Sequence, residues 1–456
     1  MSTSSKKRAT FHSRLGFILV SAGCAVGLGN VWKFPYICGE NGGGAFLLIY
    51  LLCLLLLGLP IVICEFAIGR GSRRSISQAL NILEQPGSRW HITKYAGIAG
   101  NYLLMMFYTM VAGWMLYYAF LYGSGKITAV SAEETSGFFS RMLDSPALMI
   151  LFAGIVVVLC IGICALGLQN GIEKITKVMM MLLIVLMLVL VVNSLRLKGA
   201  GEGLKYFLVP SFSRLKENGY GSVAFAAMTH AFFTLSVGIG AMEIFGSYLK
   251  KGRRITGEAI NVVILDTFVA VMAGLIIIPA CFAYGVEPDQ GPSLIFVTLP
   301  NIFINMPMGQ IWGGLFFVFM TFASFSTVTA VFEALIGNCM DNFGWGRKKA
   351  VYILLPLVFF GSIPCVLGFN MWSDVQILGS KGILDTEDFI VSNLVLPIGS
   401  LIFALFCVSK YGWGFDHYLK EVNTGDGMKI PRWLKPYFQI VLPLLITVIA
   451  ARSLIG

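Results

Sequence analysis

The sequence carries little charge for its length. Lys, Arg, Asp and Glu make up 12% of the 456 residues, whereas 57% are hydrophobic and the mean hydropathy is +0.81. A soluble domain of this size has nowhere to bury so much apolar surface, so that class is excluded. The net charge of +10 comes from short basic clusters between apolar runs and does not indicate a nucleic-acid partner. The composition predicts a polytopic, all-α membrane protein in a lipid bilayer.

Residues that would support catalysis or a metal centre are also scarce. The loops contain no nucleophile–base pair and no HExxH motif, and the four histidines are scattered, at His12, His91, His230 and His417. The ten cysteines lie almost all inside apolar runs, which predicts buried free thiols rather than disulfides or metal ligands. A membrane enzyme is therefore not favoured. The basic Lys6-Lys7-Arg8 leads straight into the first apolar run, so no cleavable signal peptide is predicted.

Eleven apolar runs have about the length that a bilayer requires. They cover residues 15–37, 42–69, 95–123, 147–166, 171–195, 221–249, 258–284, 308–340, 350–368, 389–409 and 433–452. With the N-terminus inside, the inner loops hold most of the 33 basic residues, so the positive-inside rule predicts a cytoplasmic N-terminus. An odd number of spans then places the C-terminus outside the cytoplasm. The expected location is the cell inner membrane or plasma membrane.

The first span is interrupted by three glycines, Gly23, Gly27 and Gly29, where the bilayer is deepest. Glycine weakens a helix, and unwound backbone at membrane depth is tolerated only where protein buries it or where it lines a cavity. Such a break points carbonyl and amide groups into one gap, which suits ions. The alternative is that these glycines only let helices pack closely. Asn30 and Lys33, polar groups beside the break, favour a site.

The sixth span contains a second interruption with a similar pattern. Val237-Gly238-Ile239-Gly240 echoes Val26-Gly27-Leu28-Gly29 five spans later, so the second copy starts from the opposite side of the membrane. This placement predicts a single transporter domain over 1–456 with two inverted five-helix repeats. The repeats cover 15–195 and 221–409, between a cytoplasmic segment 1–14 and a final helix 433–452.

Two further features leave alternatives open. The outer connection 285–306 is predicted to be a turn and a short amphipathic helix, either a lid or an ordinary loop helix. Glu65, Glu243 and Glu333 are carboxylates inside spans, which are costly and usually functional. They can instead be neutral and hydrogen-bonded to unwound backbone, the interpretation favoured for Glu65.

The broken first and sixth spans carry specific motifs. They read Ala25-Val26-Gly27-Leu28-Gly29-Asn30-Val31-Trp32-Lys33-Phe34-Pro35-Tyr36, Glu40-Asn41-Gly42-Gly43-Gly44-Ala45-Phe46, and Phe232-Phe233-Thr234-Leu235-Ser236 with Gly238 and Gly240. These residues resemble the neurotransmitter:sodium symporter family, and the eleven spans resemble its short bacterial branch. The resemblance covers essentially all spans. It implies a sodium-driven amino-acid symporter with broken helices 1 and 6.

The resemblance also implies two sodium sites, and sodium as a hard cation prefers such oxygen ligands. The first is expected to use the Ala25 carbonyl, Asn30, Thr234, Asp266 and the substrate carboxylate. The second is expected to use the carbonyls of Gly23, Val26 and Ala323 with the hydroxyls of Ser326 and Thr327. Hydroxyls within a helix more often bond back to the preceding turn, which is the alternative for Ser326 and Thr327.

The implied substrate site lies between the same two breaks. Amides of Leu28 and Gly29 and the hydroxyl of Tyr108 would receive a carboxylate, and carbonyls of the sixth span an ammonium. Gly27 stands where relatives that carry amines have an aspartate, which implies an amino-acid substrate. The full expected set is Cys24, Ala25, Gly27, Leu28, Gly29, Leu104, Tyr108, Phe233, Thr234, Ser236, Ile239, Thr327 and Val331. Its apolar lining predicts a neutral apolar or aromatic side chain.

Two gates and an ion preference follow from the resemblance. Lys33 and Asp388 occupy the outer-gate positions, and lysine lacks the bidentate fork of the arginine found in many relatives. The inner gate is expected to comprise Arg8 and Asp341 with Tyr248 nearby, and Phe11 replaces a tryptophan common in relatives. Asp266 stands where chloride-dependent members have an asparagine, so no chloride requirement is expected.

Other functions on this scaffold remain as alternatives. A channel would need a continuous polar pore, whereas the polar residues here converge on one midplane site. A non-transporting membrane sensor would keep the site but not the coupling. The hypothesis that we carry forward is a sodium-coupled symporter.

Overall fold

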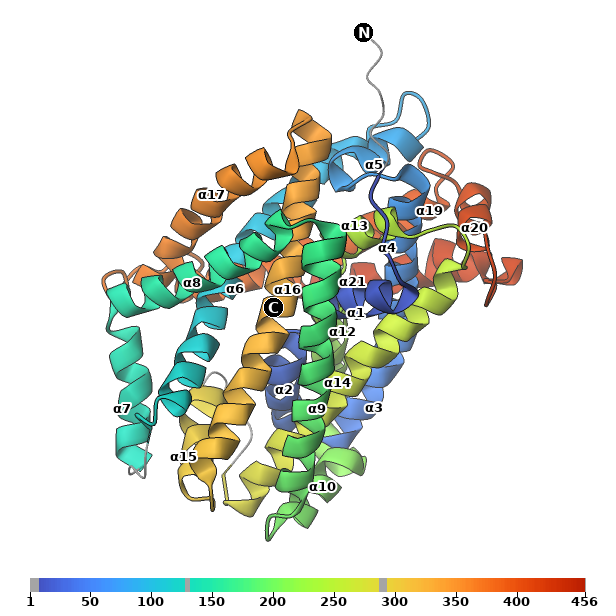
Figure 1. Ribbon diagram of the computed structural model, residues 1–456. Coiled ribbons are helices and arrows are strands. Elements are labelled where there is room, and N and C mark those ends of the chain that lie inside the picture. The colour runs from blue at the N-terminus through green and yellow to red at the C-terminus, as the bar shows by residue number, and fades with distance from the viewer. Residues whose placement is uncertain (1–7, 128–131, 287–292, 456) are drawn as a thin grey trace.

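The structure, a computed structural model, describes residues 8–127, 132–286 and 293–455. In these ranges the chain is helical apart from turns and two isolated bridges (Figure 1). The predicted basic residues Lys6 and Lys7, and most of the turn predicted before residue 293, lie outside the described residues.

Nine helical runs in the described residues are long and apolar enough to cross a membrane. They are Gly44–Ser72, Trp90–Gly123, Pro146–Ala165 (α8), Leu168–Leu195, Ile255–Ala283 (α14), Gly309–Phe343 (α16), Arg347–Leu367 (α17), Ile383–Val408 and Arg432–Arg452. Their parts include α3 (Gly44–Cys53), α4 (Leu59–Ser72), α6 (Lys94–Gly123), α9 (Lys174–Leu195), α18 (Ile383–Phe389), α19 (Leu396–Val408) and α21 (Leu442–Ile455). Short π- or 3-10-helical turns join or extend them, at Leu54–Gly58, Trp90–Thr93, Leu168–Glu173, Ile390–Val395, Arg432–Leu434 and Tyr437–Val441.

The first span is a bent pair of helices. α1 (Arg14–Ala25) is followed after three residues by a π-helical turn η1 (Gly29–Lys33) and α2 (Phe34–Glu40), and the two halves are inclined by 56°. The Ser13 hydroxyl accepts the amide of Gly16 at 2.9 Å and so caps the start of α1. The predicted interruption of the first span is present.

The sixth span is not one continuous helix, so the second predicted interruption is present as well. It is divided into α12 (Tyr220–Thr234) and α13 (Ala241–Tyr248), and neither half is long enough to cross a bilayer alone. In the connection, Ser236, Gly238 and Gly240 have φ of 50°, 96° and 74°, which no α-helix accommodates. By length and composition the described residues thus hold nine candidate spans, or ten with the bent first span, and the predicted eleventh is the broken sixth span.

Short helices in the connections were not predicted, with one exception. They are α5 (Ile76–Leu83), α7 (Ala132–Leu143), α10 (Ala200–Leu208), α11 (Phe212–Glu217) and α20 (Phe415–Val422). The exception is η5 (Leu294–Thr298) with α15 (Leu299–Ile304), which is mostly buried rather than amphipathic. The Phe296 ring lies 5.5 Å from that of Trp114 and 5.1 Å from that of Phe139, so this segment is packed into the helices around it.

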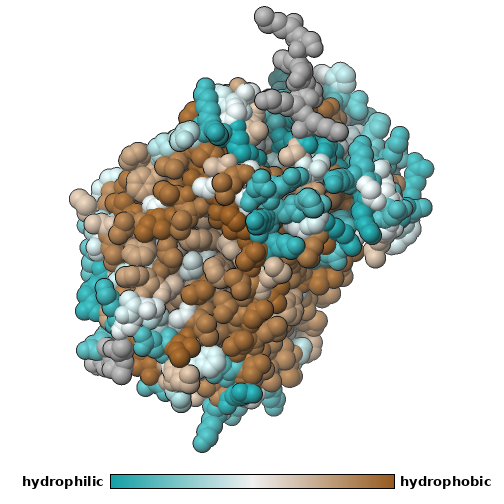
Figure 2. Space-filling model, viewed as in Figure 1, coloured by the Kyte–Doolittle hydropathy of each residue, from teal (hydrophilic) through white to brown (hydrophobic). Residues whose placement is uncertain are grey.

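The surface agrees with membrane insertion. Figure 2 shows a broad apolar belt across the visible face, with hydrophilic residues gathered at its two ends. Large apolar side chains such as Leu188 of α9, Ile264 of α14 and Phe360 of α17 are exposed. Lipid tails solvate such side chains, whereas water would not. Within the belt, α16 runs beside α6 along the length of the molecule (Figure 1).

The connection of the sixth span packs backbone to backbone against α19. A Cβ atom added to Gly399 would meet the carbonyl carbon of Gly238 at 2.7 Å, and one added to Gly238 would meet the carbonyl carbon of Leu396 at 2.9 Å. Real Cβ atoms do not approach backbone this closely, so both positions require glycine. This contact holds the unwound segment in place from the side of α19.

We expect Gly399→Ala to lower the free energy of unfolding by about 1–3 kcal/mol, because the added methyl overpacks rigid backbone. Gly162→Ala in α8 is the matched control, since nothing lies within 4 Å of the added methyl there. Its higher helix propensity should instead stabilise the protein by up to about 1 kcal/mol. Thermal unfolding of both variants in detergent measures the difference. Equal stability of the two variants would contradict the close contact.

Candidate functional site

The backbone at the break of the first span is held by Asn30. Its Oδ1 accepts the amide of Gly27 at 3.0 Å, and the Gly27 carbonyl accepts the amides of Asn30 and Val31 at 3.1 and 3.2 Å. Asn30 is fully buried, so its side chain replaces the water that would otherwise satisfy the freed backbone. The break is a defined turn rather than a loosened helix.

Five oxygens meet where α1 ends beside α16. The Thr327 hydroxyl lies 3.3 Å from the Gly23 carbonyl oxygen and 3.1 Å from that of Val26. The Ser326 hydroxyl lies 3.2 Å from the Val26 carbonyl and 2.8 Å from that of Ala323 one turn earlier. Ser326 therefore bonds back to its own helix and also faces the break. Oxygens sharing a cation at about 2.4 Å lie about 3.4 Å apart at right angles, so the spacing suits a hard cation.

A second polar cluster surrounds Asp266 of α14. The Asn30 side-chain amide donates to its Oδ1 at 2.8 Å and to its carbonyl at 3.1 Å, and the Thr234 hydroxyl lies 3.3 Å from both carboxyl oxygens. Asp266 is fully buried, and no described Lys, Arg or His forms an ion pair with it. A bound cation would balance this carboxyl group if it is ionised.

A small cavity of about 10 Å³ lies between the two breaks. Its lining comprises Ala25, Gly29, Leu104, Tyr108, Phe233, Ser236, Ile239, Thr327 and Leu396. Eight of these nine belong to the expected substrate set. Leu396 does not, because it lies in an apolar run of the tenth span that carries no local sign of a site. The volume holds about one water molecule, so this state encloses too little space for an amino acid.

The remaining residues of the expected set lie around this cavity without lining it. The carbonyl oxygen of Cys24 accepts a hydrogen bond from the Ser236 hydroxyl at 3.2 Å. Val331 is buried one turn beyond Thr327 in α16. The amide of Leu28 donates to the Tyr108 hydroxyl at 2.7 Å. Two of the three groups expected to receive a carboxylate are therefore bonded to each other here.

Gly27 lies against the hydroxyl groups of two residues that line the cavity, Tyr108 and Thr327. A Cβ atom at this position would run into the hydroxyl groups of both Tyr108 and Thr327. The site therefore has no room for a side chain at position 27 in this state, and the space beside Gly27 is bounded by hydroxyl and amide groups.

The predicted outer-gate residues are in contact. Both carboxyl oxygens of Asp388 lie 2.6 Å from the Lys33 ammonium, and the pair is about one quarter exposed. Ser392 donates to Asp388 at 2.8 Å, and the Lys33 ammonium lies 3.9 Å from the centre of the Phe233 ring. Phe233 lines both the cavity and a space of about 30 Å³ next to Lys33, so its ring separates the two.

The predicted inner-gate residues are in contact as well. Arg8 Nη1 lies 2.9 Å from both carboxyl oxygens of Asp341, and its guanidinium is 4.9 Å from the Tyr248 ring centre. Asp341 also accepts the amide and hydroxyl of Ser75 at 2.7 and 2.8 Å. Phe11 is buried against the rings of Phe17, Phe245 and Tyr248, so the phenylalanine packs where relatives have tryptophan.

Sequence reasoning missed residues that support the inner gate. Glu173 accepts the amides of His12 and Ser13 at 2.7 and 2.9 Å and so holds the N-terminal segment. Arg347 pairs with Glu333 at 2.6 Å, and Tyr248 donates to Glu333 at 2.6 Å. Glu333 is thus a partner within an ion pair. These contacts join residues far apart in sequence and leave no local pattern.

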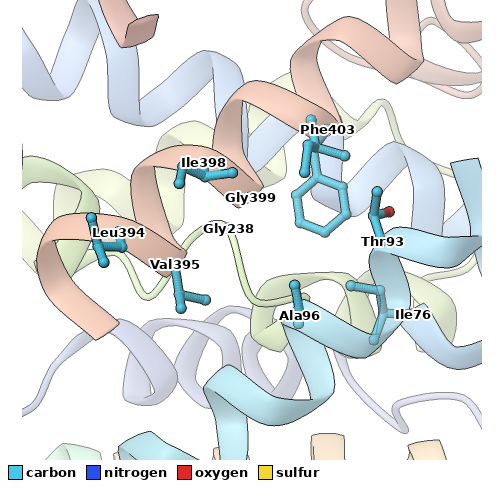
Figure 3. A pocket seen from close by; sticks show the side chains of 11 residues that line it. Ile76, Thr93, Ala96, Gly238, Leu394, Val395, Ile398, Gly399 and Phe403 are labelled. Atoms are coloured by element: carbon cyan, nitrogen blue, oxygen red, sulfur yellow. The ribbon is translucent and has the colours of Figure 1, made fainter. Parts of the chain in front are cut away.

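A larger cavity of about 120 Å³ lies outside the candidate site. Figure 3 shows it between Ile76, Ala96, Val395 and Phe403, with Gly238 on its wall. Its lining side chains are apolar except that of Thr93. It offers no set of groups for a carboxylate or an ammonium, so the small cavity at the two breaks is the candidate substrate site.

Comparison with known proteins identifies the family. The model of the sodium:neurotransmitter symporter family matches residues 8–128 and 144–456. An uncharacterized sodium-dependent transporter, YhdH of Bacillus subtilis, is 36% identical over 423 residues, 93% of this chain and 92% of the relative. An uncharacterized sodium-dependent transporter of Haemophilus influenzae is 32% identical over the full length of both chains. The crystal structure of MhsT in complex with L-phenylalanine is 38% identical, with a TM-score of 0.88 over 98% of this chain and 100% of that one.

The chain therefore belongs to the sodium:neurotransmitter symporter family. It is a sodium-dependent, multi-pass membrane transporter, and the predicted family and fold class are confirmed. The substrate and ion ligands of this chain stay predictions that the geometry above supports.

We expect Asp388→Asn to shift the protein toward outward-open states, because it removes the charge that holds Lys33. The pair is partly exposed, so its loss should cost about 1 kcal/mol, or about a fivefold change in the population ratio. The reporter is Leu384→Cys, which lines the space beside Lys33 and whose labelling rate measures opening. The ten native cysteines are buried and give little background. An unchanged labelling rate would contradict the gate assignment.

Proposed function

We propose that the protein imports a neutral apolar or aromatic amino acid together with sodium by alternating access. The observation that carries this proposal is the cavity at the junction of the two broken helices. Its walls are apolar, its polar groups are backbone and hydroxyl groups, and it has no charged lining side chain. A charged substrate side chain would find no partner there, which disfavours basic and acidic amino acids.

The substrate would be oriented by its two charged ends. Its carboxylate would displace the Tyr108 hydroxyl from the Leu28 amide and accept hydrogen bonds from both, at the positive end of the half-helix that begins near Gly29. Its ammonium would lie against the carbonyls of Phe233, Thr234 and Ser236. The absence of room for a side chain at Gly27 supports a substrate that supplies its own carboxylate.

Two sodium ions are proposed as co-substrates. One would bind at the Asp266 cluster, where the Ala25 carbonyl, Asn30, Thr234 and the substrate carboxylate complete the ligands. The other would bind the five oxygens contributed by α1 and α16. Because the first ion would share the substrate carboxylate, each would bind more tightly in the presence of the other.

The nature of the substrate side chain rests on the apolar wall and on a relative. Leu104, Ile239 and Leu396 contribute apolar side chains to the lining of the cavity. MhsT, which is 38% identical, was crystallised with L-phenylalanine. An aromatic amino acid requires the cavity to expand from its present volume, which opening of the gates allows.

The closed gates favour a transporter over a channel on this scaffold. An ion pair closes each of the two predicted gates, Lys33–Asp388 and Arg8–Asp341, whereas a conducting channel would need both sides open at once. In the proposed orientation the Arg8 side faces the cytoplasm. A non-transporting sensor would share this geometry, and uptake distinguishes it from a symporter.

A binding screen of the purified protein against the twenty amino acids tests the proposal. We expect apolar or aromatic amino acids to bind in sodium and to lose most of their affinity when sodium is replaced by choline. Phenethylamine, which lacks the carboxylate of phenylalanine, should bind at least about tenfold more weakly, since two hydrogen bonds to a charged group are lost. Tight binding of the amine, or preference for lysine or glutamate, would contradict the proposal.

The screen has matched variants for the ion sites. Thr327→Ala and Asn30→Ala should each weaken both sodium and substrate binding by about tenfold, because linkage is reciprocal. Thr109→Ala is the control, since its hydroxyl donates to the Met105 carbonyl of its own helix and is absent from the cavity lining. Unchanged sodium dependence in both site variants would refute the placement of the ions.

We expect transport to continue unchanged when gluconate replaces chloride. The ionised Asp266 carboxylate would supply the negative charge that chloride supplies elsewhere. Two charges about 4 Å apart attract by roughly 4 kcal/mol at an effective dielectric constant near 20. Asp266→Asn should therefore abolish transport or make it depend on chloride. Strong chloride dependence of the unmodified protein would show that Asp266 does not carry this charge.

A further inference from the structure

Glu243 is a buried acid that the proposed transport cycle does not use. It is the third residue of α13 and is completely inaccessible to solvent. Neither of its carboxyl oxygens has a hydrogen-bond partner among the described residues. A buried polar group without a partner is uncommon, so this one requires an explanation.

The neighbouring acid, Glu65 of α4, is in the opposite situation. Its Oε1 accepts the amide of Gly238 at 2.5 Å, and its Oε2 accepts the amide of Glu243 at 3.2 Å. Glu65 is thus hydrogen-bonded to backbone, as the sequence analysis favoured, but both of its oxygens accept, which suits a carboxylate rather than the neutral acid expected there. The side chain of Glu243 is left without a donor, although the two acids belong to helices packed against each other.

The charged groups that act on Glu243 come from three elements. They are Glu65 of α4, Asp341 of α16 and Arg8 of the segment before α1. Arg8 is already bound to Asp341, and its Nε lies 3.2 Å from the hydroxyl of Ser247, one turn beyond Glu243 on α13. Its Nη2 has no hydrogen-bond partner among the described residues. Glu243 therefore lies one helical turn from the inner gate.

The two protonation states of Glu243 differ greatly in cost. A buried neutral hydroxyl without a partner costs about 1–3 kcal/mol. A buried carboxylate without a donor or cation costs several times as much, and a second carboxyl group beside it raises that cost. While the inner gate is closed, Glu243 rather than Glu65 is therefore the neutral, protonated acid.

We propose that Glu243 is a proton-binding site linked to the inner gate. The carboxyl group holds a proton while Arg8 and Asp341 are joined. When this pair separates, water reaches α13, the carboxyl group ionises, and the proton leaves to the solution on that side. This inference adds a proton to the proposed cycle and depends on the gate rather than on the identity of the substrate.

The sign of the resulting pH dependence follows from linkage. Closing the gate takes up one proton, so acid on the gate side stabilises the closed state, and rising pH favours the open state. The ratio of open to closed protein changes by up to tenfold per pH unit in the range where only the open state has lost its proton. Outside that range the ratio is constant.

Infrared difference spectroscopy tests the proton directly. Its probe is the C=O stretch of a protonated carboxyl group in the unmodified protein with its inner gate closed. We expect Glu243→Gln to remove one such band and Glu65→Gln to retain it. Loss of the band only in Glu65→Gln would place the proton on Glu65 and overturn the proposal. An unchanged spectrum in Glu243→Gln would overturn it as well.

Gate opening provides the second readout. The reporter is Leu249→Cys, a buried position in the space covered by the N-terminal segment, whose labelling rate is followed against pH. We expect the rate to rise with pH and Glu243→Gln to remove the rise. Glu258→Gln is the control that keeps it, because Glu258 is a buried acid paired with Arg14 at 2.8 Å. A pH dependence that survives in Glu243→Gln would contradict the proposal.

A third variant keeps the proposal testable if Glu243→Gln fails to fold. Glu243→Met matches the length of the side chain and removes its polar atoms, so a neutral acid should be replaced without loss of thermal stability. If Glu243 were instead ionised and bridged to Arg8 through water, both Met and Gln variants would be destabilised and the proposal would fail.

Discussion

Backbone that leaves a helix inside a membrane must find hydrogen-bond partners within the protein. Two helices of this transporter break partway along their length, and the surrounding side chains are arranged by that requirement. Asn30 and Tyr108 satisfy amides of the first break, and Glu65 satisfies amides of the second. The packing of Gly238 against Gly399 then leaves no space for the second break to move sideways without moving α19.

The groups that hydrogen-bond to the two breaks differ in kind, and this difference suggests the function. At the end of α1 the carbonyls of Gly23 and Val26 accept hydrogen bonds from the hydroxyls of Ser326 and Thr327. A sodium ion would turn the same hydroxyls into ligands, so one set of residues serves both the empty and the loaded state. Tyr108 behaves in the same way, because its hydroxyl occupies the position proposed for the substrate carboxylate. Substrate binding would then replace one hydrogen bond by another instead of leaving a polar group without a partner.

Much of this architecture was predictable from the sequence because membrane spans and helix breaks are local. Apolar length marked the spans, and glycines marked both breaks. The gate pairs, separated by more than 300 residues, followed only from resemblance to a family. Features created by tertiary packing were not predictable: the wall formed by Leu396, the hold of Glu173 on the N-terminal segment, and the pairing of Glu333 with Arg347. The short amphipathic helices of the loops were missed because their apolar periodicity extends over only two or three turns.

Accumulation of phenylalanine in proteoliposomes tests the central claim most directly. The account predicts that an inward sodium gradient drives uptake above the outside concentration. It also predicts that uptake collapses when the gradient is removed with equal sodium on both sides. Binding without accumulation would show a sensor on a transporter scaffold, and accumulation that is independent of sodium would contradict the coupling.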